Sequence, residues 1–554
     1  MTTTTDTTVR TAVLDDAHVG DIHGALGTIR LGDHGERRGL SAKLKTLLAI
    51  AGPGLIVMVG DNDAGAFATY GQAGQNYGTH LLWTLLLLVP VLYVNQEMVL
   101  RLGAVTGVGH ARLILERFGR FWGAFSVIDL FILNALTLVT EFIGITLAAG
   151  YLGLPKAASV VLAAVIIVAS AFTGSFRRFE RIAMVLCAGS LLLVPVSFMV
   201  HPAASQMAHD FLVPTMPGGS GQAATVMLLI IGIVGTTVAP WQLFFQQSYV
   251  IDKRITPRFM KYEKADLWLG IAVVVIGAAA LMGAAAAAFA GTHGAGNFTD
   301  TAGLAHGIAA HAGRLAGVLF AIALLDASII GAFAVSLSTA YAIGDVFGIK
   351  HSLHRGVSGA KGFYAVYAAL VCLAAVIVLL PGSPLGLLTE GVQTLAGVLL
   401  PSASVFLLLL CNDKQVLGPW VNGPRTNAFT AAVVGVLVTL SVILTASVLF
   451  PHIGSGAILD IMAVCGAAGA VAAGYALVRR RGGAGAGVEA PVEVLDEVPV
   501  DRSDRDSWRM PPLETLTRPV MATGRKIGMG ALRGYLAVAM VLVVIRIVEV
   551  AIGH

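Results

Sequence analysis

Twelve long apolar segments follow one another along the chain, and each is compatible with the roughly 20 residues that a helix needs to cross a bilayer. Only 12% of the 554 residues are charged, whereas about 25% are charged in soluble domains. The chain is therefore predicted to be an all-α, polytopic membrane protein. The segments lie at residues 48–77, 80–101, 121–148, 157–174, 182–200, 222–250, 266–290, 315–346, 363–380, 385–411, 428–450 and 456–478.

Clusters of Lys and Arg mark every second loop between these segments. The loops between them, such as residues 202–221 and 381–386, carry no Lys or Arg. Under the positive-inside rule, the N-terminus and the basic loops face the cytoplasm, and we expect a multi-pass protein of the plasma membrane. The clusters are Arg112, Arg117 and Arg120; Arg177, Arg178 and Arg181; Lys253, Arg254, Arg258, Lys261 and Lys264; Lys350, Arg355 and Lys361; Lys414 and Arg425; and Arg479 to Arg481.

Two aspartates, Asp61 and Asp63, lie in the middle of the first apolar segment. An ionised carboxylate at that depth is costly unless it faces water, a counter-charge or a bound ion. Gly60 and Gly65 flank the pair, which predicts that the helix is interrupted here and that backbone carbonyls are free to act as ligands. This stretch is therefore a candidate cation site.

The sixth segment contains a second predicted break. Pro240 removes a helical donor, and Gly235 lowers the cost of unwinding. Interrupted spans at corresponding positions of two five-helix halves are typical of inverted-repeat transporters with a site at the membrane midplane. The sequence thus predicts a transporter with helices 1 and 6 broken and about two further C-terminal spans.

Two short motifs accompany these breaks. Gly52-Pro-Gly is followed, after eight residues, by Asp63-Ala-Gly-Ala-Phe-Ala-Thr, and the sixth segment contains Thr237-Val-Ala-Pro-Trp-Gln-Leu. They resemble the first-helix signature Asp-Pro-Gly-Asn and the sixth-helix signature Met-Pro-His of the Nramp divalent metal transporters. The resemblance spans roughly residues 45–450 and implies the leucine-transporter-type fold, with a divalent cation between helices 1 and 6. Further matching stretches are residues 101–107, residues 177–180, and Gln393 with Leu400 and Pro401.

Three positions depart from this family pattern. Ala66 stands where the family has Asn, Ala239 where it has Met, and Trp241 where it has His. A thioether favours late transition metals, so its loss removes that preference, whereas oxygen ligands with room for water suit Mg²⁺. The pattern resembles the Nramp-related magnesium transporters. Plant relatives that carry aluminium also lack the Met, but they keep the His.

The resemblance implies a metal site built from hard oxygen donors. It comprises Asp63, the carbonyls of Gly60 and Thr236, the hydroxyls of Thr236 and Thr237, and the amide of Gln393, with Ala66 and Ala239 leaving space for water. Secondary candidates are Asp61, acting through water, Glu141 and Asp326.

Proton coupling is not expected. Trp241 replaces a His that takes part in proton movement, and Leu138 replaces an Asp of the third helix, although Glu141 is retained. We therefore expect uptake of largely hydrated Mg²⁺, and possible transport of Mn²⁺, without protons.

The segments outside the resemblance give the remaining boundaries. Residues 1–45 are predicted to be a flexible cytoplasmic tail, and residues 481–530 are predicted to be an acidic cytoplasmic linker. Residues 531–554 form either a thirteenth span or an interfacial helix, and the sequence does not decide between them. Between them lie a first repeat with the start of helix 6 at 46–250, the rest of the second repeat at 251–411, and helices 11 and 12 at 412–480.

Other functions remain as alternatives. The first is a proton-coupled Mn²⁺ or Fe²⁺ transporter of the ordinary Nramp kind, and the second is a sodium-coupled carrier of an organic substrate. An enzyme is not expected, because the spans show neither a nucleophile with a base nor a His-rich zinc motif. The expected partners are the metal ion and the lipid bilayer, with no cofactor and no nucleic acid; a monomer is expected, although the sequence leaves the oligomeric state open.

Overall fold

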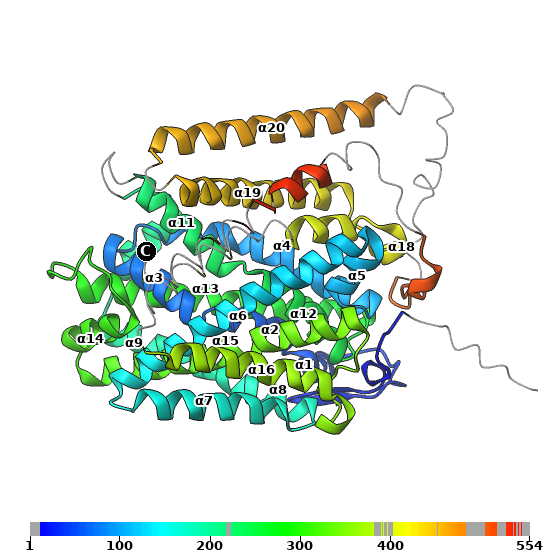
Figure 1. Cartoon of the computed structure of the whole chain (residues 1–554), viewed down its shortest axis with the longest axis horizontal. Coiled ribbons are helices and arrows are strands. Elements are labelled where there is room, and N and C mark those ends of the chain that lie inside the picture. Colours follow the sequence, from blue (N-terminus) through cyan, green and yellow to red (C-terminus); the bar gives the residue numbers. More distant parts are fainter. Residues whose placement is uncertain are drawn as a thin grey trace, which may run out of the picture.

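The computed structural model describes most of the chain as a bundle of helices (Figure 1). The only strands among the described residues are β1 (Ile22–Gly24) and β2 (Gly27–Ile29), which form an antiparallel hairpin near the N-terminus. The described residues are 12–217, 223–381, 389, 392, 396, 403–450, 453–482, 505–517, 528–535, 537–538, 541 and 545.

The helices follow the order of the predicted segments. They are α1 (Leu40–Ile50), α2 (Pro53–Val59), α3 (Ala64–Tyr77), α4 (Trp83–Thr106), α5 (His110–Phe118), α6 (Arg120–Tyr151), α7 (Lys156–Ala171), α8 (Phe176–Gly189), α9 (Leu193–Val200), α10 (Ala204–Leu212), α11 (Ala223–Thr237), α12 (Pro240–Asp252), α13 (Met260–Phe289), α14 (Thr301–Ala312), α15 (Arg314–Phe347), α16 (Lys361–Leu379), α18 (Lys414–Leu417), α19 (Pro424–Leu449) and α20 (Ser455–Gly482). Single turns of 3₁₀ helix lie at Asp16–His18 (η1), Ser190–Leu192 (η2), Pro257–Phe259 (η3), Val357–Gly359 (η4), Gly418–Trp420 (η5) and Leu513–Thr515 (η7).

Nine helices of the described part are long and apolar enough to cross a membrane, or ten if α1 and α2 count as one bent span. Three of the twelve predicted segments are not among these nine helices. The first segment is divided among α1, α2 and α3, and α7 has only 16 residues. Most of the tenth predicted segment, residues 385–411, lies outside the described residues.

Small residues bring the helices of the centre together. The long helix α15 packs along α6, and α13 packs against both α2 and α3. A Cβ added to Gly54 would lie 2.6 Å from the backbone nitrogen of Leu267, and one added to Gly74 would lie 2.3 Å from the carbonyl oxygen of Met282. Glycine therefore sets the distance at which both pieces of the first span meet α13, as is usual for helices packed in lipid.

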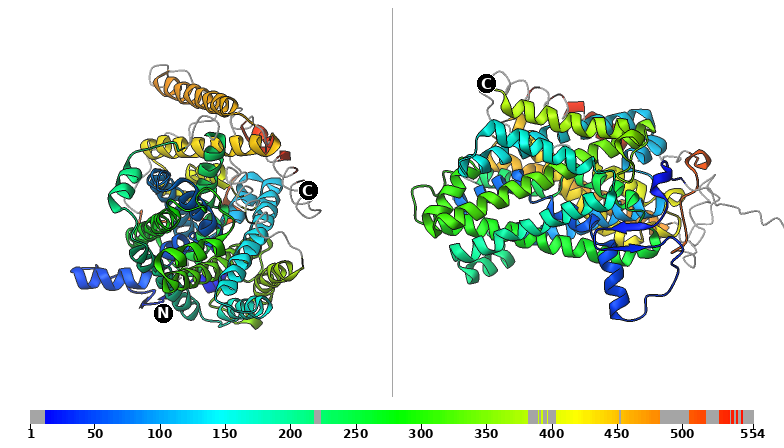
Figure 2. Two further views of the ribbon diagram at one scale, coloured as in Figure 1. Left: turned by 90° about the vertical axis from the view of Figure 1, so that its left-hand side faces the viewer. Right: turned by 90° about the horizontal axis from the view of Figure 1, so that it is seen from below.

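The predicted flexible tail over residues 1–45 contains a folded part in the structure. In the described part of that tail, Ile22 pairs with Ile29 across the hairpin, and both side chains are buried. The helix α1 follows, projects sideways from the bundle near one end (Figure 2), and meets α2 at an angle of 54°. No long apolar run or periodic pattern in the tail predicts this hairpin. Its contacts are made with distant parts of the chain, which local sequence patterns do not show.

The predicted linker over residues 481–530 also has a described part that packs on the bundle. Met510 is buried, and its N–H donates to the carbonyl of Val105 over 3.3 Å. The Trp420 Nε1–H donates to the carbonyl of Arg505 over 2.7 Å. Beyond the linker, most of the apolar stretch 536–552 lies outside the described residues, so its role stays a prediction.

Candidate metal centre

The first apolar span is broken between α2 and α3. The helix α2 ends at Val59, Gly60 caps it, and α3 begins only at Ala64. Asp63 is the N-cap of α3, and its Oδ1 accepts a hydrogen bond from the Ala66 N–H over 2.9 Å. A carboxylate is a favoured N-cap because it satisfies a donor that has no helical partner.

This break leaves carbonyl groups without their helical donors. In a continuous helix the N–H of Ala64 would bond the carbonyl of Gly60, and the N–H of Ala66 would bond that of Asn62. Here the Ala64 N–H donates to Glu141 Oε2 over 3.3 Å, and the Ala66 N–H donates to Asp63. The carbonyl oxygens of Gly60 and Asn62 are therefore available to another partner.

The sixth span is broken in a similar way between α11 and α12. The helix α11 ends at Thr237, Ala239 is extended with φ −96° and ψ 144°, and Pro240 begins α12. Because Pro240 has no N–H, the carbonyl of Thr236 loses the donor four residues later that a continuous helix would supply. The predicted free carbonyl of Thr236 thus has a local structural cause.

The two breaks face each other inside the bundle. The Tyr70 hydroxyl of α3 lies 2.6 Å from Thr237 Oγ1, and the amide of Gln242 donates to Asp61 Oδ1. The Trp241 indole closes one side, since a Cβ added to Gly60 would lie 3.5 Å from its ring. Residues about 170 positions apart are therefore in direct contact at this point.

Several polar atoms at this meeting point are buried without a hydrogen-bond partner. They are Asp61 Oδ2, Asn62 Oδ1, Thr236 Oγ1 and Glu141 Oε1. Buried polar atoms are rarely left unsatisfied, and each unmade bond costs about 1–3 kcal/mol. A hydrated cation between the breaks would satisfy these oxygens, because all four can act as acceptors.

Glu141 of α6 lies beside the first break. Its Oε2 accepts a hydrogen bond from the N–H of Ala64, the residue that follows Asp63, over 3.3 Å. A second carboxyl group, which can accept or release a proton, therefore reaches the break that contains the candidate metal ligand.

The structure brings most of the predicted site residues together. The first break contains Gly60, Asp61 and Asp63, and the second contains Thr236 and Thr237. Glu141 contacts the first break through the N–H of Ala64. Their role as ligands stays a prediction. Ala66 occupies the first turn of α3 and Ala239 the second break, and both are buried. Gln393 lies outside the described residues.

Asp326 does not join this group. It packs against Gly189 of α8, where an added Cβ would lie 2.5 Å from its Oδ1. Ser328, two residues later on α15, instead faces Gly144, which also approaches Ala64 of the first break. Two residues turn a helix by about 200°, so Asp326 points to the opposite side of α15. Its contacts therefore give no support to a role as a secondary metal candidate, which stays a prediction.

Sequence reasoning missed four residues of the centre. Gln242 bonds Asp61, Gln96 Nε2 donates to Gln242 Oε1 over 3.0 Å, and Tyr70 bonds Thr237. Asn62 donates to the carbonyl of Val274 over 3.2 Å. The available signal was the presence of uncharged polar residues inside apolar spans, which are retained there only when they find partners.

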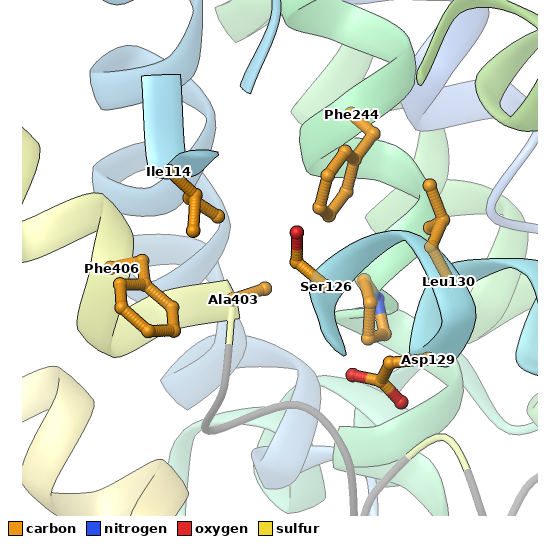
Figure 3. Close-up of a pocket in the computed structure, with 8 residues that line it drawn as sticks. Ile114, Ser126, Asp129, Leu130, Phe244, Ala403 and Phe406 are labelled. Carbon is orange, nitrogen blue, oxygen red and sulfur yellow. The ribbon is translucent and has the colours of Figure 1, made fainter. Parts of the chain in front are cut away.

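A small cavity lies next to the second break (Figure 3). Its walls are mainly apolar and come from α5, α6, α12 and residues 403–406. Ser126 and Asp129 of α6 are its polar lining residues, and Pro240 and Phe244 form the side next to the break. Among the described residues, no three His, Cys, Asp or Glu side chains converge as a closed metal cluster.

Comparisons with known proteins agree with this architecture. The family model described as natural resistance-associated macrophage protein-like, Nramp, matches residues 54–447. A divalent metal cation transporter MntH of Ralstonia nicotianae is 31% identical over 401 residues, which are 69% of this chain and 87% of the relative. One of Klebsiella pneumoniae is 25% identical over 413 residues, covering 72% and 94% of the two chains.

Solved structures show the same fold. The manganese transporter of Eremococcus coleocola, in complex with an aromatic bis-isothiourea compound, superposes with a TM-score of 0.62. It is 21% identical, and the match covers 80% of this chain and 97% of that one. At this identity the likeness concerns the arrangement of the helices and not the ion that is carried.

Proposed function

Since the chain belongs to the Nramp family of divalent metal transporters, we propose that it carries a divalent metal cation across the membrane, bound between the α2–α3 break and the α11–α12 break. The observation that carries this proposal is the meeting of the two breaks around unsatisfied buried oxygens. Broken helices whose free carbonyls face each other at mid-membrane are the usual ion site of such transporters.

The finer architecture belongs to the same proposal. The first five and the next five predicted membrane spans would form two inverted repeats. Each repeat would begin with one of the two broken spans, α2–α3 or α11–α12. The equivalent positions of the breaks, at the start of each set of five, support this relation. Transport would then proceed as one part of the bundle rocks against the other around a fixed site.

The side chains at the breaks support magnesium as the ion. Asp61, Asp63 and Thr236 offer oxygen donors, and Ala66 and Ala239 offer only methyl groups. Mg²⁺ binds through one or two carboxylates and keeps several of its waters. Among the described residues of the two breaks, no thioether or imidazole adds a preference for a softer metal.

A proton-coupled manganese transporter is the second candidate, and two observations favour it. The relatives reported above include MntH proteins and a manganese transporter. Glu141 also reaches the first break through the N–H of Ala64, so a carboxyl group that can carry a proton is present there without the His. Oxygen ligands suit Mn²⁺ as well as Mg²⁺, so the ligand set alone does not separate the two.

Coupling is tested by recording internal pH during uptake into liposomes. Each charge moved through 100 mV is worth about 2.3 kcal/mol, so a divalent ion gains about twice that, enough for a roughly thousandfold gradient without protons. We expect voltage-driven uptake with no acidification, both in the natural protein and in Glu141→Gln. Metal-dependent proton entry that disappears in Glu141→Gln, but persists in the Asp326→Asn control, would establish the coupled mechanism instead.

A further inference from the structure

The described part of the N-terminal tail, residues 12–38, lies across the end of the bundle where the basic loops gather (Figures 1 and 2). We call it the N-terminal segment. It contains the turn η1 and the hairpin β1–β2, and Ala12, Ile22 and Ile29 are buried. Its contacts involve the Arg residues that also indicate the cytoplasmic face.

One set of contacts joins the N-terminal segment to the second half of the chain. Arg254, just after α12, donates to the carbonyls of Ala17 over 2.8 Å and of Asp21 over 3.0 Å. Arg355, in the loop between α15 and α16, bonds Asp15 over 2.6 Å and also contacts Asp16. The segment is thus held by two loops of the second half.

A second set of contacts joins it to α8 in the first half. Arg177 Nε donates to the carbonyl of Gly24 over 3.2 Å, and Arg181 Nε donates to that of Ala25 over 3.0 Å. The Ala25 N–H donates to Glu180 Oε2 over 2.5 Å. The hairpin therefore bridges α8 and the loops that follow α12 and α15.

Glu180 extends this connection to the broken first span. Its Oε1 lies 2.7 Å from Lys253 Nζ, and both side chains are fully buried. The same ammonium donates to the carbonyls of Ile50 over 2.6 Å and Ala51 over 2.9 Å, at the junction of α1 and α2. The segment thus reaches, through one ion pair, the start of the helix that leads to the candidate metal centre.

We propose that the N-terminal segment is a latch that holds this end of the transporter closed, and that it must release before the ion can leave on this side. Alternating access requires parts of the bundle to rock against each other. A segment that is bonded to α8 and to the loops after α12 and α15, and that is connected through Glu180 and Lys253 to the start of α2, resists that motion. The outermost of these ion pairs joins Arg355 to the exposed Asp16, and an exposed pair of this kind is individually weak, which permits release from the outside.

A reversible cross-link tests this latch. Asp16 is exposed and contacts Arg355. The double variant Asp16→Cys with Arg355→Cys therefore places one thiol on the N-terminal segment and one on the loop between α15 and α16. The exposed Cys372 and the partly exposed Cys465 are replaced by Ser, and the pair is joined in detergent with a short bifunctional methanethiosulfonate reagent. Mg²⁺ uptake and Mg²⁺ binding are then measured before cross-linking, after it, and after reduction.

We expect the cross-linked protein to bind Mg²⁺ with unchanged affinity but to lose at least nine-tenths of its uptake, and reduction to restore it. The matched control is Glu36→Cys with Arg38→Cys, an exposed ion pair within the segment, whose cross-link should leave uptake unchanged. Uptake by the cross-linked Asp16–Arg355 pair at the uncross-linked rate would overturn the latch. Absence of divalent metal uptake before cross-linking would instead contradict the proposed function.

Discussion

Asp63→Asn is expected to reduce divalent metal uptake by about a thousandfold while the protein remains folded. Two unit charges 4 Å apart interact by about 4 kcal/mol at an effective dielectric constant of 20, and each 1.4 kcal/mol is a factor of ten. Asparagine keeps the N-cap of α3 that Asp63 provides through Ala66, because its side-chain oxygen still accepts that bond. Uptake by proteoliposomes and thermal unfolding of the same preparation measure the two effects separately.

Asp63→Ala is a second variant, which we expect to be less stable than Asp63→Asn. It removes the charge and also the cap, so we expect the same loss of uptake together with a loss of about 1 kcal/mol in the free energy of unfolding. Asp326→Asn is the matched control, since that carboxyl group of α15 faces Gly189 and not the breaks. Normal Mg²⁺ uptake by the Asp63→Asn protein would refute the assignment of the metal centre.

The double variant Ala239→Met with Ala66→Asn is expected to raise the Mn²⁺-to-Mg²⁺ uptake ratio by at least about tenfold, which corresponds to 1.4 kcal/mol. A thioether adds a soft ligand, and both larger side chains occupy space that the waters of Mg²⁺ need. Both alanines are buried, so the enlargement also costs about 1–3 kcal/mol of stability. Competition between the two metals in one uptake assay gives the ratio directly.

Leu370→Met is the control for this variant. It places a thioether in the buried face of α16 with little change in volume, and α16 packs on α6, α7 and α15. We expect its metal ratio to match that of the natural protein. An unchanged ratio in the double variant would show that selectivity arises outside the two breaks.

The sequence was sufficient to locate the breaks because their causes are local. Pro240 removes a donor wherever it stands, and glycines beside Asp61 and Asp63 interrupt a helix regardless of its neighbours. The contacts that complete the centre are not local. The bonds from Gln242 to Asp61 and from Tyr70 to Thr237 join distant segments, and no spacing in one segment specifies the partner in another.

The same reasoning explains two larger differences between the expectations from the sequence and the structure. Asp326 has apolar neighbours on both sides, so its sequence context resembles that of a functional carboxylate, and only the rotation of α15 shows which way it points. The N-terminal segment has few apolar residues, and polar contacts from Arg254 and Arg355 help to hold it in place. Composition predicts flexibility for such a segment, because composition contains no information on its distant partners.

Uptake of Mg²⁺, Mn²⁺ and Ca²⁺ into proteoliposomes, compared side by side at a fixed membrane potential with internal pH recorded, tests the central claim most directly. The account predicts that Mg²⁺ enters down the potential at neutral internal pH, that Mn²⁺ competes with it, and that Asp63→Asn abolishes both. Entry of Mn²⁺ with protons, together with no Mg²⁺ entry at any potential, would contradict the proposed selectivity and identify an ordinary proton-coupled manganese transporter.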